Sequence, residues 1–466
     1  MHPSHERLGV EVFIPGENKQ KNPSCPHGPM LMFERYFESK PPRRFYSCSA
    51  CRDRKECNFF QWEDETPSIA SQDAHRRIIE ASKPSISHTQ CLKRLKRVRR
   101  LKESQRTYCH TCAQLLLPKE MDKHNDHEMT SGISDDIVSS PSYLFKPLDK
   151  KKSFAQYLFS DASVDFLLET FERLGYKNIL CIGTPRIHEA IQTKKVNEMD
   201  SILLDLDHRY AQFNDEGRFI HYNMFNHHFF DEDLAKPLLQ NFFENSKLNS
   251  LLVVLDPPFG GLVEVLAASI RKIWKLADCN KDNKELPTFW IFPYFMESHI
   301  VEEMPSFNMC ELKVNYDNHP LYKKRHSSSA KTSPVRIFTN VSLRDIVLPE
   351  DEGYRYCEKC ERYVSESNVH CELCNDCTSK DGRIWLHCGL CNKCVKKDRV
   401  HCQSCDRCEV AEHVCQRSLR GCHICGKLDH KRKNCPDRPR LHSGGNKRKM
   451  GKEKSSKIKK SKGISE

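Results

Sequence analysis

The middle of the chain, from about residue 150 to 345, alternates short apolar runs with longer amphipathic stretches. Short apolar runs predict buried strands, and apolar residues spaced three or four apart predict helices. The expected strands are residues 178–183, 201–206, 219–222, 250–255, 288–293, 309–316 and 334–343. The expected helices are residues 161–174, 186–193, 232–243 and 261–276. Strands that alternate with helices favour a mostly parallel, doubly wound sheet, so we predict one α/β domain over residues 143–347.

The segments on either side of this region follow other patterns. Residues 1–20 are polar and lack periodicity, which predicts a flexible N-terminus. Residues 74–103 alternate Ile and Leu with Arg and Lys, which predicts one basic helix. Residues 438–466 end in Lys, Ser and Gly with almost nothing apolar, so we expect a disordered basic tail. Such a tail serves as a nuclear or nucleolar address or as an RNA-binding segment.

Length and charge narrow the class of protein. A chain of 466 residues predicts two to four domains. Its 75 Lys and Arg against 63 Asp and Glu give a net charge of +12, which favours polyanionic partners, nucleic acid first. The N-terminus has no charged-then-apolar signal segment, and no run of 18 apolar residues occurs. We therefore expect a soluble, intracellular protein with no membrane partner.

The 25 cysteines fall mostly in Cys-x-x-Cys pairs with histidines nearby, a spacing typical of zinc sites rather than disulfides. They gather in four modules, over residues 21–66, 106–130, 354–417 and 420–437. From residue 357 to 435 large apolar residues are too few for a core, so we expect zinc to replace it there. The spacing predicts about seven zinc ions in all.

The two N-terminal modules carry one predicted zinc each. The first is similar to the GRF-type zinc finger, known for binding single-stranded nucleic acid, and its expected ligands are Cys25, His27, Cys48 and Cys57, with Cys51 as a substitute. Its Phe60 and Trp62 either stack bases or form its core. The second has the ligands of a two-Cys two-His finger, Cys109, Cys112, His124 and His127. The gap between its histidines is shorter than usual, so we predict zinc binding without base-specific reading.

The C-terminal modules hold the densest Cys/His pattern. His-Cys-x2-Cys-x2-Cys occurs three times, and with the flanking residues it resolves into four interleaved sets of three Cys and one His. The sets are Cys357, Cys360, His370 and Cys377; Cys371, Cys374, His387 and Cys394; Cys388, Cys391, His401 and Cys408; and Cys402, Cys405, His413 and Cys415. This array resembles the DHHC-type domain of protein palmitoyltransferases, but Leu386-His387-Cys388 replaces its Asp-His-His-Cys. We therefore expect scaffolding rather than acyl transfer.

The last module matches the CCHC zinc knuckle. Its expected ligands are Cys422, Cys425, His430 and Cys435. Gly426 follows the second cysteine, and the flanking cations are Lys427, Lys431, Arg432 and Lys433. Knuckles bind single-stranded RNA through a small apolar cleft and flanking charge, so we expect the same here, with a purely structural role as the alternative.

The candidate for catalysis follows the apolar run from Leu251 to Leu255. There Asp256, Pro257, Pro258 and Phe259 stand at the carboxyl edge of the predicted sheet, where doubly wound folds bind ligands. An aromatic amine becomes a good nucleophile when its hydrogens are held and its lone pair is directed, and a carboxylate, a carbonyl and an aromatic face achieve this. We assign the amine to Asp256 and the Pro257 carbonyl, and the stacking face to Phe259. An arbitrary Asp-Pro-Pro sequence is more often an ordinary turn.

Asp256-Pro257-Pro258-Phe259 resembles the Asp/Asn-Pro-Pro-aromatic motif of amino-methyltransferases, in the version of the N6-adenine branch, and the resemblance spans roughly residues 150–345. It implies a Rossmann-like class I domain with a mostly parallel seven-stranded sheet, and S-adenosylmethionine as the methyl donor. It implies that the segment Gln156-Tyr157-Leu158-Phe159-Ser160-Asp161 touches the methionine end of the donor. The positions it assigns to the donor are Phe159, Ser160 and Asp161 of that segment, and Gly183, Arg186, Asp207, Asn223, Met224 and Asp256. Asp207 is preferred to Asp205 for the ribose because Asp205 lies within an apolar run. Thr184-Pro185-Arg186 lacks the family's further glycines.

The full set of modules resembles the zinc-knuckle methyltransferases that make N6-methyladenosine in large-subunit ribosomal RNA. The resemblance implies a structured RNA substrate with a flipped or unpaired adenine, ribosome-biogenesis or RNA-processing proteins as partners, and a place in the nucleus and nucleolus, with the cytoplasm as a second location. Two alternatives stay open: a catalytically inactive RNA-binding scaffold, and a protein amide or lysine methyltransferase. Asn315–Pro320 and the basic loop 321–331 are expected near the active-site edge, where they either gate the site or form a solvated loop.

Overall fold

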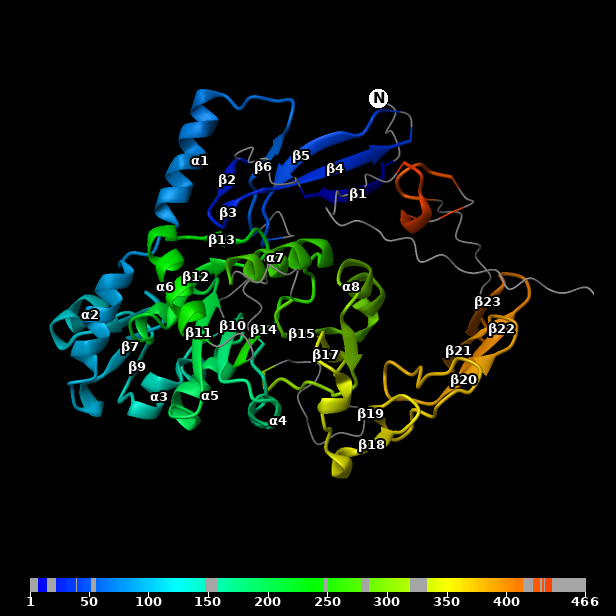
Figure 1. The fold of residues 1–466 in the computed structure, drawn as a ribbon. Helices are drawn as coiled ribbons and strands as arrows, with labels where there is room; N and C mark the ends of the chain where they lie inside the picture. The colour runs from blue at the N-terminus through cyan, green and yellow to red at the C-terminus, as the bar shows by residue number, and fades with distance from the viewer. Residues whose placement is uncertain are drawn as a thin grey trace, which may run out of the picture.

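The computed structural model describes residues 7–14, 22–38, 40–51, 56–146, 157–246, 250–277, 285–318, 333–413, 422–427, 430 and 432–437. Its centre is an eight-stranded sheet in the order β13-β12-β11-β10-β14-β15-β17-β16 (Figure 1). The strands are β10 (Asn178–Ile182), β11 (Asp200–Asp205), β12 (Phe219–Asn223), β13 (His228–Phe229), β14 (Leu251–Leu255), β15 (Thr288–Pro293), β16 (Asn308–Cys310) and β17 (Val335–Thr339). β10, β11, β12, β14 and β15 run parallel, and β13, β16 and β17 pair antiparallel. The predicted mostly parallel α/β sheet is confirmed, with short β13 as an eighth strand.

Helices cover both faces of the sheet, which makes the fold doubly wound. They are α4 (Asp161–Arg173), α5 (Pro185–Lys194), α6 (Glu232–Asn245), α7 (Val263–Leu276) and α8 (Glu297–Glu303). Successive residues of β14 enter different cores: Leu251, Val253 and Leu255 pack with α6 and α7, whereas Leu252 and Val254 pack with α4 and α5. Because neighbouring side chains of a strand point to opposite faces, an unbroken apolar run is what a strand buried on both sides requires.

The N-terminal finger contains a strand that the sequence did not predict. Its sheet has the order β1-β4-β5-β6, built from β1 (Arg7–Phe13), β4 (Leu31–Phe37), β5 (Arg43–Ser47) and β6 (Phe60–Trp62), beside the hairpin β2 (Ser24–Cys25) and β3 (Gly28–Pro29). β1 pairs antiparallel with β4 from Arg7 to Phe13. The prediction of a flexible segment over residues 1–20 is therefore wrong for β1, because a partner strand supplies the hydrogen bonds. The rest of that segment, apart from residue 14, lies outside the described residues.

The predicted basic helix over residues 74–103 is also wrong, because two helices occupy this region. α1 (Ile69–Ala81) and α2 (His88–Val98) are separated by a turn that contains Pro84. Proline lacks a backbone N–H and disfavours helical geometry in the residue before it. Ser87 then starts α2 with a capping box, in which its side chain accepts from the Gln90 backbone N–H and the Gln90 side chain accepts from the Ser87 backbone N–H.

The remaining modules pack around the central domain. The second finger is a small sheet of β7 (Thr107–Cys109), β8 (Gln114–Leu116) and β9 (Met129–Ser131), followed by the short α3 (Asp135–Ser139). The Cys/His array forms three hairpins: β18 (Tyr354–Cys357) with β19 (Arg362–Ser365), β20 (Trp385–Cys388) with β21 (Lys393–Lys396), and β22 (Arg399–Cys402) with β23 (Arg407–Val410). The first hairpin packs on the central domain, where Tyr354 joins its core, and in Figure 1 the other two hairpins extend away from the sheet as an arm. None of the helices in the described ranges combines the length and the apolarity needed to cross a bilayer.

Candidate functional site

A pocket opens at the carboxyl ends of four neighbouring parallel strands. Gly183 after β10, Asp205 and Asp207 at the end of β11, Met224 after β12 and Asp256 after β14 all line it. This is the edge at which doubly wound sheets bind ligands. Segments outside the sheet complete the walls, and they contribute Ser142, Phe145, Lys146, Tyr157, Leu158, Arg209, Tyr210 and Asn318. Most of these outer residues were not singled out from the sequence, because nothing in their local pattern marks a pocket wall.

Asp256 sits in this pocket with Tyr316 as its partner. The Tyr316 hydroxyl donates to Asp256 Oδ1 at 2.9 Å. Burial raises the pKa of the Asp256 carboxyl well above its usual range, while the Tyr316 hydrogen bond pulls in the opposite direction. The Phe259 ring lies 6.2 Å from the Tyr157 ring and 6.1 Å from the Tyr316 ring, between ring centroids. Three aromatic rings therefore lie together, and one of them, Tyr316, holds an oxygen of the Asp256 carboxyl group.

The Pro257 carbonyl was predicted to accept the second N–H of the amine. In the described part of the chain no group donates a hydrogen bond to it, whereas the Pro258 carbonyl accepts from the Gly261 backbone N–H at 2.7 Å. The turn after β14 is thus closed one residue beyond the predicted acceptor, which leaves the Pro257 carbonyl available for this role.

The segment predicted to touch the donor, Gln156 to Asp161, meets the pocket through part of its length, and Gln156 lies outside the described residues. A β-bridge joins Phe159 to Tyr316, and the Asn318 side chain accepts from the Leu158 backbone N–H at 2.8 Å. Tyr157 and Leu158 line the pocket, whereas the predicted donor contacts Phe159, Ser160 and Asp161 are absent from its described lining. Phe159 is buried against Tyr316, Ser160 caps α4, and Asp161 accepts from the Tyr143 hydroxyl at 2.7 Å. Within the predicted segment, Tyr157 and Leu158 therefore make the contact with the pocket, and the three residues after them do not.

Arg186 was also assigned to the donor, and the structure places it behind the pocket. The side chain is 7 % exposed, and its Nη1 donates to the Phe159 carbonyl at 2.8 Å and pairs with Asp317. The guanidinium also lies over the Tyr143 ring, 4.1 Å from its centroid. Arg186 thus joins three segments of the chain and holds the wall that carries Tyr157 and Tyr316.

Gly183 is required by its surroundings. Its φ is +64°, and a Cβ added there would stand 2.8 Å from Met224 Cε and 3.4 Å from the Asp256 carbonyl oxygen. A side chain at this position would fill the space between the ends of β10 and β14, where a ligand must approach the backbone. One glycine thus provides the close approach, although Thr184-Pro185-Arg186 replaces the glycines expected after it.

The two acidic residues at the end of β11 have different surroundings. The Asp207 carboxylate is 6 % exposed and is paired with Arg209, whose Nη2 lies 2.6 Å from Oδ2 and whose Nε lies 3.0 Å from each carboxylate oxygen. Among the described residues, the Asp205 carboxylate accepts only from backbone N–H groups, with that of Asp207 at 2.8 Å from its Oδ1, and burial raises the pKa of Asp205 to about 7. Both line the pocket, but the Asp207 carboxylate is already engaged by a cation. The geometry therefore favours Asp205 over the predicted Asp207 as a ligand acceptor.

Asn223 holds the first zinc finger against the sheet. Its Nδ2 donates to the His27 carbonyl at 2.7 Å and to Ser49 Oγ at 2.9 Å, and its Oδ1 accepts from the Phe225 backbone N–H at 3.0 Å. Asn226 adds hydrogen bonds to the carbonyls of His27 at 3.1 Å and Pro29 at 2.8 Å. Asn223 and neighbouring Met224, both predicted at the donor's adenine, line the pocket, but the polar atoms of the Asn223 side chain are engaged by the finger and by the Phe225 N–H.

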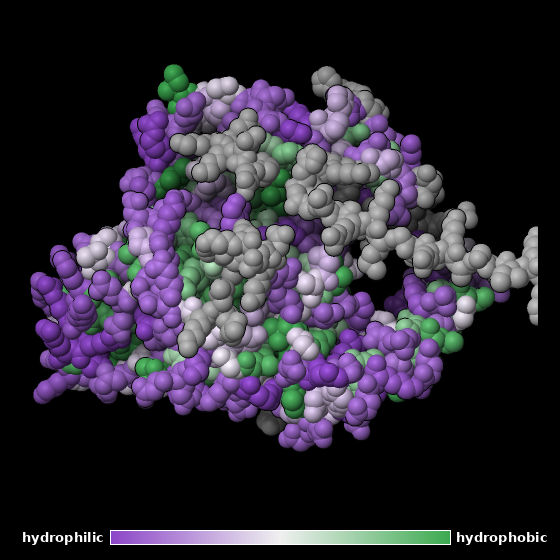
Figure 2. Space-filling model, in the orientation of Figure 1, coloured by the Kyte–Doolittle hydropathy of each residue, from purple (hydrophilic) through white to green (hydrophobic). Residues whose placement is uncertain are grey.

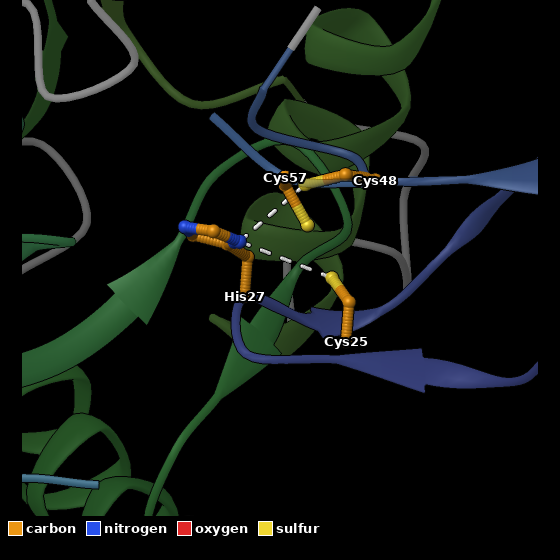
Figure 3. A group of neighbouring side chains, drawn as sticks. All are labelled: Cys25, His27, Cys48 and Cys57. Atoms are coloured by element: carbon orange, nitrogen blue, oxygen red, sulfur yellow. Dashed lines mark hydrogen bonds between the residues drawn. The ribbon is translucent and has the colours of Figure 1, made fainter. Parts of the chain in front are cut away.

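The predicted ligands of the first finger converge in space. One ligand atom each from Cys25, His27, Cys48 and Cys57 lies within 4.8 Å of the others, as Figure 3 shows. His27 Nδ1 is 3.9 Å from Cys25 Sγ and 3.4 Å from Cys48 Sγ. Cys51 also approaches, with its Sγ 3.7 Å from His27 Nε2. Three thiolates and one imidazole are the donor set that a tetrahedral structural zinc site takes.

The structure brings together four further predicted ligand sets. Groups with the same 4.8 Å spacing are Cys109, Cys112, His124 and His127; Cys357, Cys360, His370 and Cys377; Cys371, Cys374, His387 and Cys394; and Cys388, Cys391, His401 and Cys408. In the fourth set of the array, Cys405 Sγ lies 3.4 Å from His413 Nε2, while Cys415 lies outside the described residues. In the knuckle, Cys425 Sγ lies 3.2 Å from His430 Nε2.

The knuckle docks on the first finger. Its Ile424 packs with Tyr36, and a Cβ on Gly9 would stand 2.5 Å from the His423 ring. Glu11, which is 7 % exposed, accepts from His423 Nε2 at 2.6 Å and from Arg432. Arg432 also donates to Glu264 of α7 at 3.0 Å. Arg432, one of the four cations expected to meet RNA, thus makes contacts within the chain.

Comparisons with known proteins match the central domain and the first zinc finger. A family model described as "Probable N6-adenine methyltransferase" matches residues 150–342, and a GRF zinc finger model matches residues 23–66. The chain is 50 % identical over 441 residues to the human protein named rRNA N(6)-adenosine-methyltransferase ZCCHC4, with 92 % of this chain and 85 % of that protein covered. Proteins of the same name are 49 % identical in mouse, with the same coverage, and 45 % identical in Xenopus tropicalis, with 92 % and 89 % covered.

Each of these relatives is aligned over nearly the whole chain, and the matched methyltransferase model spans the pocket that holds Asp256. The tetrapeptide, the sheet and the first zinc finger thus point to one and the same group of proteins. The chain belongs to the family of rRNA N6-adenosine methyltransferases, in which an N6-adenine methyltransferase domain is joined to a GRF zinc finger.

Proposed function

We propose that the chain transfers a methyl group from S-adenosylmethionine to the N6 amine of an adenosine in ribosomal RNA. The single observation that carries this proposal is the Asp256 carboxylate, held by Tyr316 among three aromatic rings at the carboxyl edge of the sheet. The matched family and the names of the relatives favour this activity over an inactive scaffold and over a protein methyltransferase. The large-subunit RNA and a flipped or unpaired adenine are the finer parts of the proposal.

The chain's own groups account for the activation of the amine. Asp256 Oδ1 is fixed by the Tyr316 hydroxyl, so Oδ2 is left to accept one N–H of the amine. The Pro257 carbonyl accepts the other N–H, and the Phe259 and Tyr157 rings bound the plane of the base. With both hydrogens held, the nitrogen lone pair points out of the ring system toward the pocket. Bond formation to carbon leaves the nitrogen with an extra proton, and the Asp256 carboxyl group, whose pKa burial raises, is the proton acceptor placed beside it.

The pocket suits the methyl donor by its shape and its chemistry. When bound, S-adenosylmethionine supplies an electrophilic methyl group on a sulfonium. Gly183 leaves the backbone open where a side chain would close the space, and Tyr157 and Leu158 bound the same pocket. We assign the ribose hydroxyls to the carboxylate of Asp205, because Arg209 already engages that of Asp207.

The test is methyl transfer to ribosomal RNA with Asp256→Ala. Purified protein, S-adenosylmethionine and unmethylated large-subunit RNA are incubated, and nucleosides are analysed by mass spectrometry. We expect N6-methyladenosine with the native chain and a loss of at least about a hundredfold with Asp256→Ala, as removal of a group essential to transition-state positioning implies. Asp233→Ala, an exposed change on α6, is the matched control. Equal activity of the two variants would refute the role of Asp256, and methyl transfer to protein alone would refute the substrate.

The zinc modules are proposed to hold about seven ions and to build the surface that carries the RNA. Three-thiolate and mixed donor sets support structural zinc, and metal analysis of the purified chain by plasma emission would count the ions. A substantially lower count after mild purification would contradict this number.

We also propose action in the nucleus and nucleolus, with the cytoplasm as a second location and ribosome-biogenesis or RNA-processing proteins as partners. Two observations support this proposal: the relatives are named for ribosomal RNA, and residues 445–466 are rich in Lys. Fluorescence microscopy of the tagged chain tests the location, and exclusion from the nucleolus would contradict it.

A further inference from the structure

Helix α2 carries a stripe of cations that the methyl-transfer site does not use. Lys93, Lys96 and Arg97 of α2 and Arg100 of the turn that follows it are all exposed. Their spacing of three and four residues places the helical cations on one side of α2, and the Arg100 N–H donates to the Arg97 carbonyl at 3.1 Å, which continues that side by one turn. In the described residues none of these four side chains forms an ion pair or a side-chain hydrogen bond. In Figure 2 a strongly hydrophilic lobe fills the lower left, where Figure 1 places α2.

The opposite face of α2 is fixed in a core. Cys91, Leu95 and Val98 are buried, and Leu95 and Val98 pack with Tyr108 and Leu115 of the second finger and with Phe213. At 100° per residue these apolar positions lie on the side of the helix opposite to the four cations. The stripe is therefore turned outward by the packing and is presented by a rigid element.

Other cations of the same segment differ, because they are held within the protein. Arg94 pairs with Glu120, and its Nη1 donates to the Leu115 carbonyl at 3.0 Å. Arg99 Nη1 lies 2.5 Å from Asp215 Oδ1. Structural needs thus account for Arg94 and Arg99 but not for the four residues of the stripe. A structural role would give those four cations partners in the fold.

The stripe is also tied to the donor pocket. α2 packs against the 3-10 helix His208–Gln212, which begins directly after Asp207. The Gln212 side chain bridges the second finger to this turn, with its Oε1 accepting from the Leu115 N–H at 2.9 Å and its Nε2 donating to the Ala113 carbonyl at 2.7 Å. A ligand on α2 is thereby held at a fixed place relative to the site.

We infer that the α2 stripe of Lys93, Lys96, Arg97 and Arg100 binds the phosphate backbone of a duplex segment of the RNA substrate, outside the methyl-transfer site. The four cations extend over about 10 Å of helix axis, at roughly 1.5 Å per residue. The exposed positions among residues 93–100 include no aromatic residue on which an unpaired base would stack. Cations without stacking partners suit a regular, base-paired backbone. The inference rests on the proposed RNA substrate.

The test compares two variants of the full chain that each lose four positive charges. One replaces Lys93, Lys96, Arg97 and Arg100 by Ala. The control replaces Arg76, Lys194, Lys195 and Lys236 by Ala, which are surface cations already paired with Asp73, Asp165, Glu172 and Glu232. Binding of a fluorescent RNA hairpin with a long stem, and of a single strand of equal length, is measured by anisotropy over a range of NaCl concentrations.

We expect the slope of log K against log[NaCl] for the hairpin to fall by about 2 to 4 in the stripe variant, since each neutralised phosphate contributes roughly 0.7–0.9. The control should keep the native slope, and both variants should keep the native melting temperature. If the quadruple change lowers that temperature, the pair Lys93→Ala and Lys96→Ala replaces it, with about half the effect. An unchanged slope, an equal loss in the control, or a loss confined to the single strand overturns the inference. An acidic protein partner for α2 would show as the first of these results.

This binding assay involves no methyl transfer, so the two proposals fail separately. If the stripe variant keeps the native salt slope while the native chain methylates RNA, only the proposed α2 contact is refuted. If the native chain does not methylate RNA while the stripe variant shows the lower salt slope, only the proposed reaction is refuted.

Discussion

Replacing Asn226 by Ala is expected to loosen the joint between the first zinc finger and the donor pocket. The Asn226 side chain donates to the carbonyls of His27 and Pro29, and it belongs to the turn that also carries Met224 and Phe225 of the pocket wall. Asn223 still donates to the His27 carbonyl in the variant, so only the Pro29 carbonyl loses its side-chain donor. A hydrogen bond contributes about 0.5–1.5 kcal/mol and an unpaired buried acceptor costs about 1–3 kcal/mol, so we expect a total loss of about 2 kcal/mol.

This loss should appear as weaker donor binding, because the finger braces the turn from outside. If about half of it reaches the pocket, the dissociation constant of S-adenosylmethionine rises roughly fivefold, since about 1.4 kcal/mol corresponds to tenfold. Isothermal titration calorimetry measures this, and hydrogen exchange of residues 22–38 reports the joint itself. Asn241→Ala, which removes one exposed amide contact on α6, is the control. Native donor affinity together with native exchange in Asn226→Ala would refute the idea that the finger supports the pocket.

Three further changes test other parts of the structure. Burial raises the pKa of Asp205 to about 7, and donor binding should favour its ionised form, so the affinity for S-adenosylmethionine should rise between pH 6 and pH 8. Asp205→Asn should flatten this dependence in calorimetric titrations, and an unchanged pH dependence in that variant would contradict the assignment. Asp207→Asn leaves Arg209 buried without its partner and should instead lower the melting temperature. Burial raises the pKa of Glu189 to about 8, so the folded state holds this proton at pH values where the unfolded state has lost it. The group therefore makes stability fall as pH rises from about 4.5 to 8, and the melting temperature of Glu189→Gln should rise relative to that of the native chain over this range. A difference in melting temperature that does not change with pH would argue against this. Glu11→Gln should weaken the contact of Arg432 that docks the knuckle, so proteolysis between the array and the knuckle should become several times faster. Methyl transfer to a short RNA should stay near native, and an unchanged cleavage rate would show that Glu11 is not needed for docking.

The sequence by itself determined the features that local chemistry dictates. Apolar runs such as Leu251–Leu255 had to become strands buried on both faces, because no other placement hides every side chain. Cys-x-x-Cys spacing defined the zinc ligands, and even the interleaving of the array followed from counting, since each set needs four donors within reach. Asp256 was found because its position after a strand and before two prolines is itself a local pattern.

Tertiary structure alone decided which side chains are occupied and which face the pocket. The sequence favoured Asp207 over Asp205, and the ion pair of Asp207 with Arg209 reverses that preference. Asn223 is held by a finger almost 200 residues earlier in the chain, and Tyr316 reaches Asp256 from a segment 60 residues later. β1 and the outward stripe of α2 likewise depend on partners distant in sequence. Hydrogen bonds and ion pairs between distant segments leave no periodic trace in a sequence, because either partner alone looks like an ordinary polar residue.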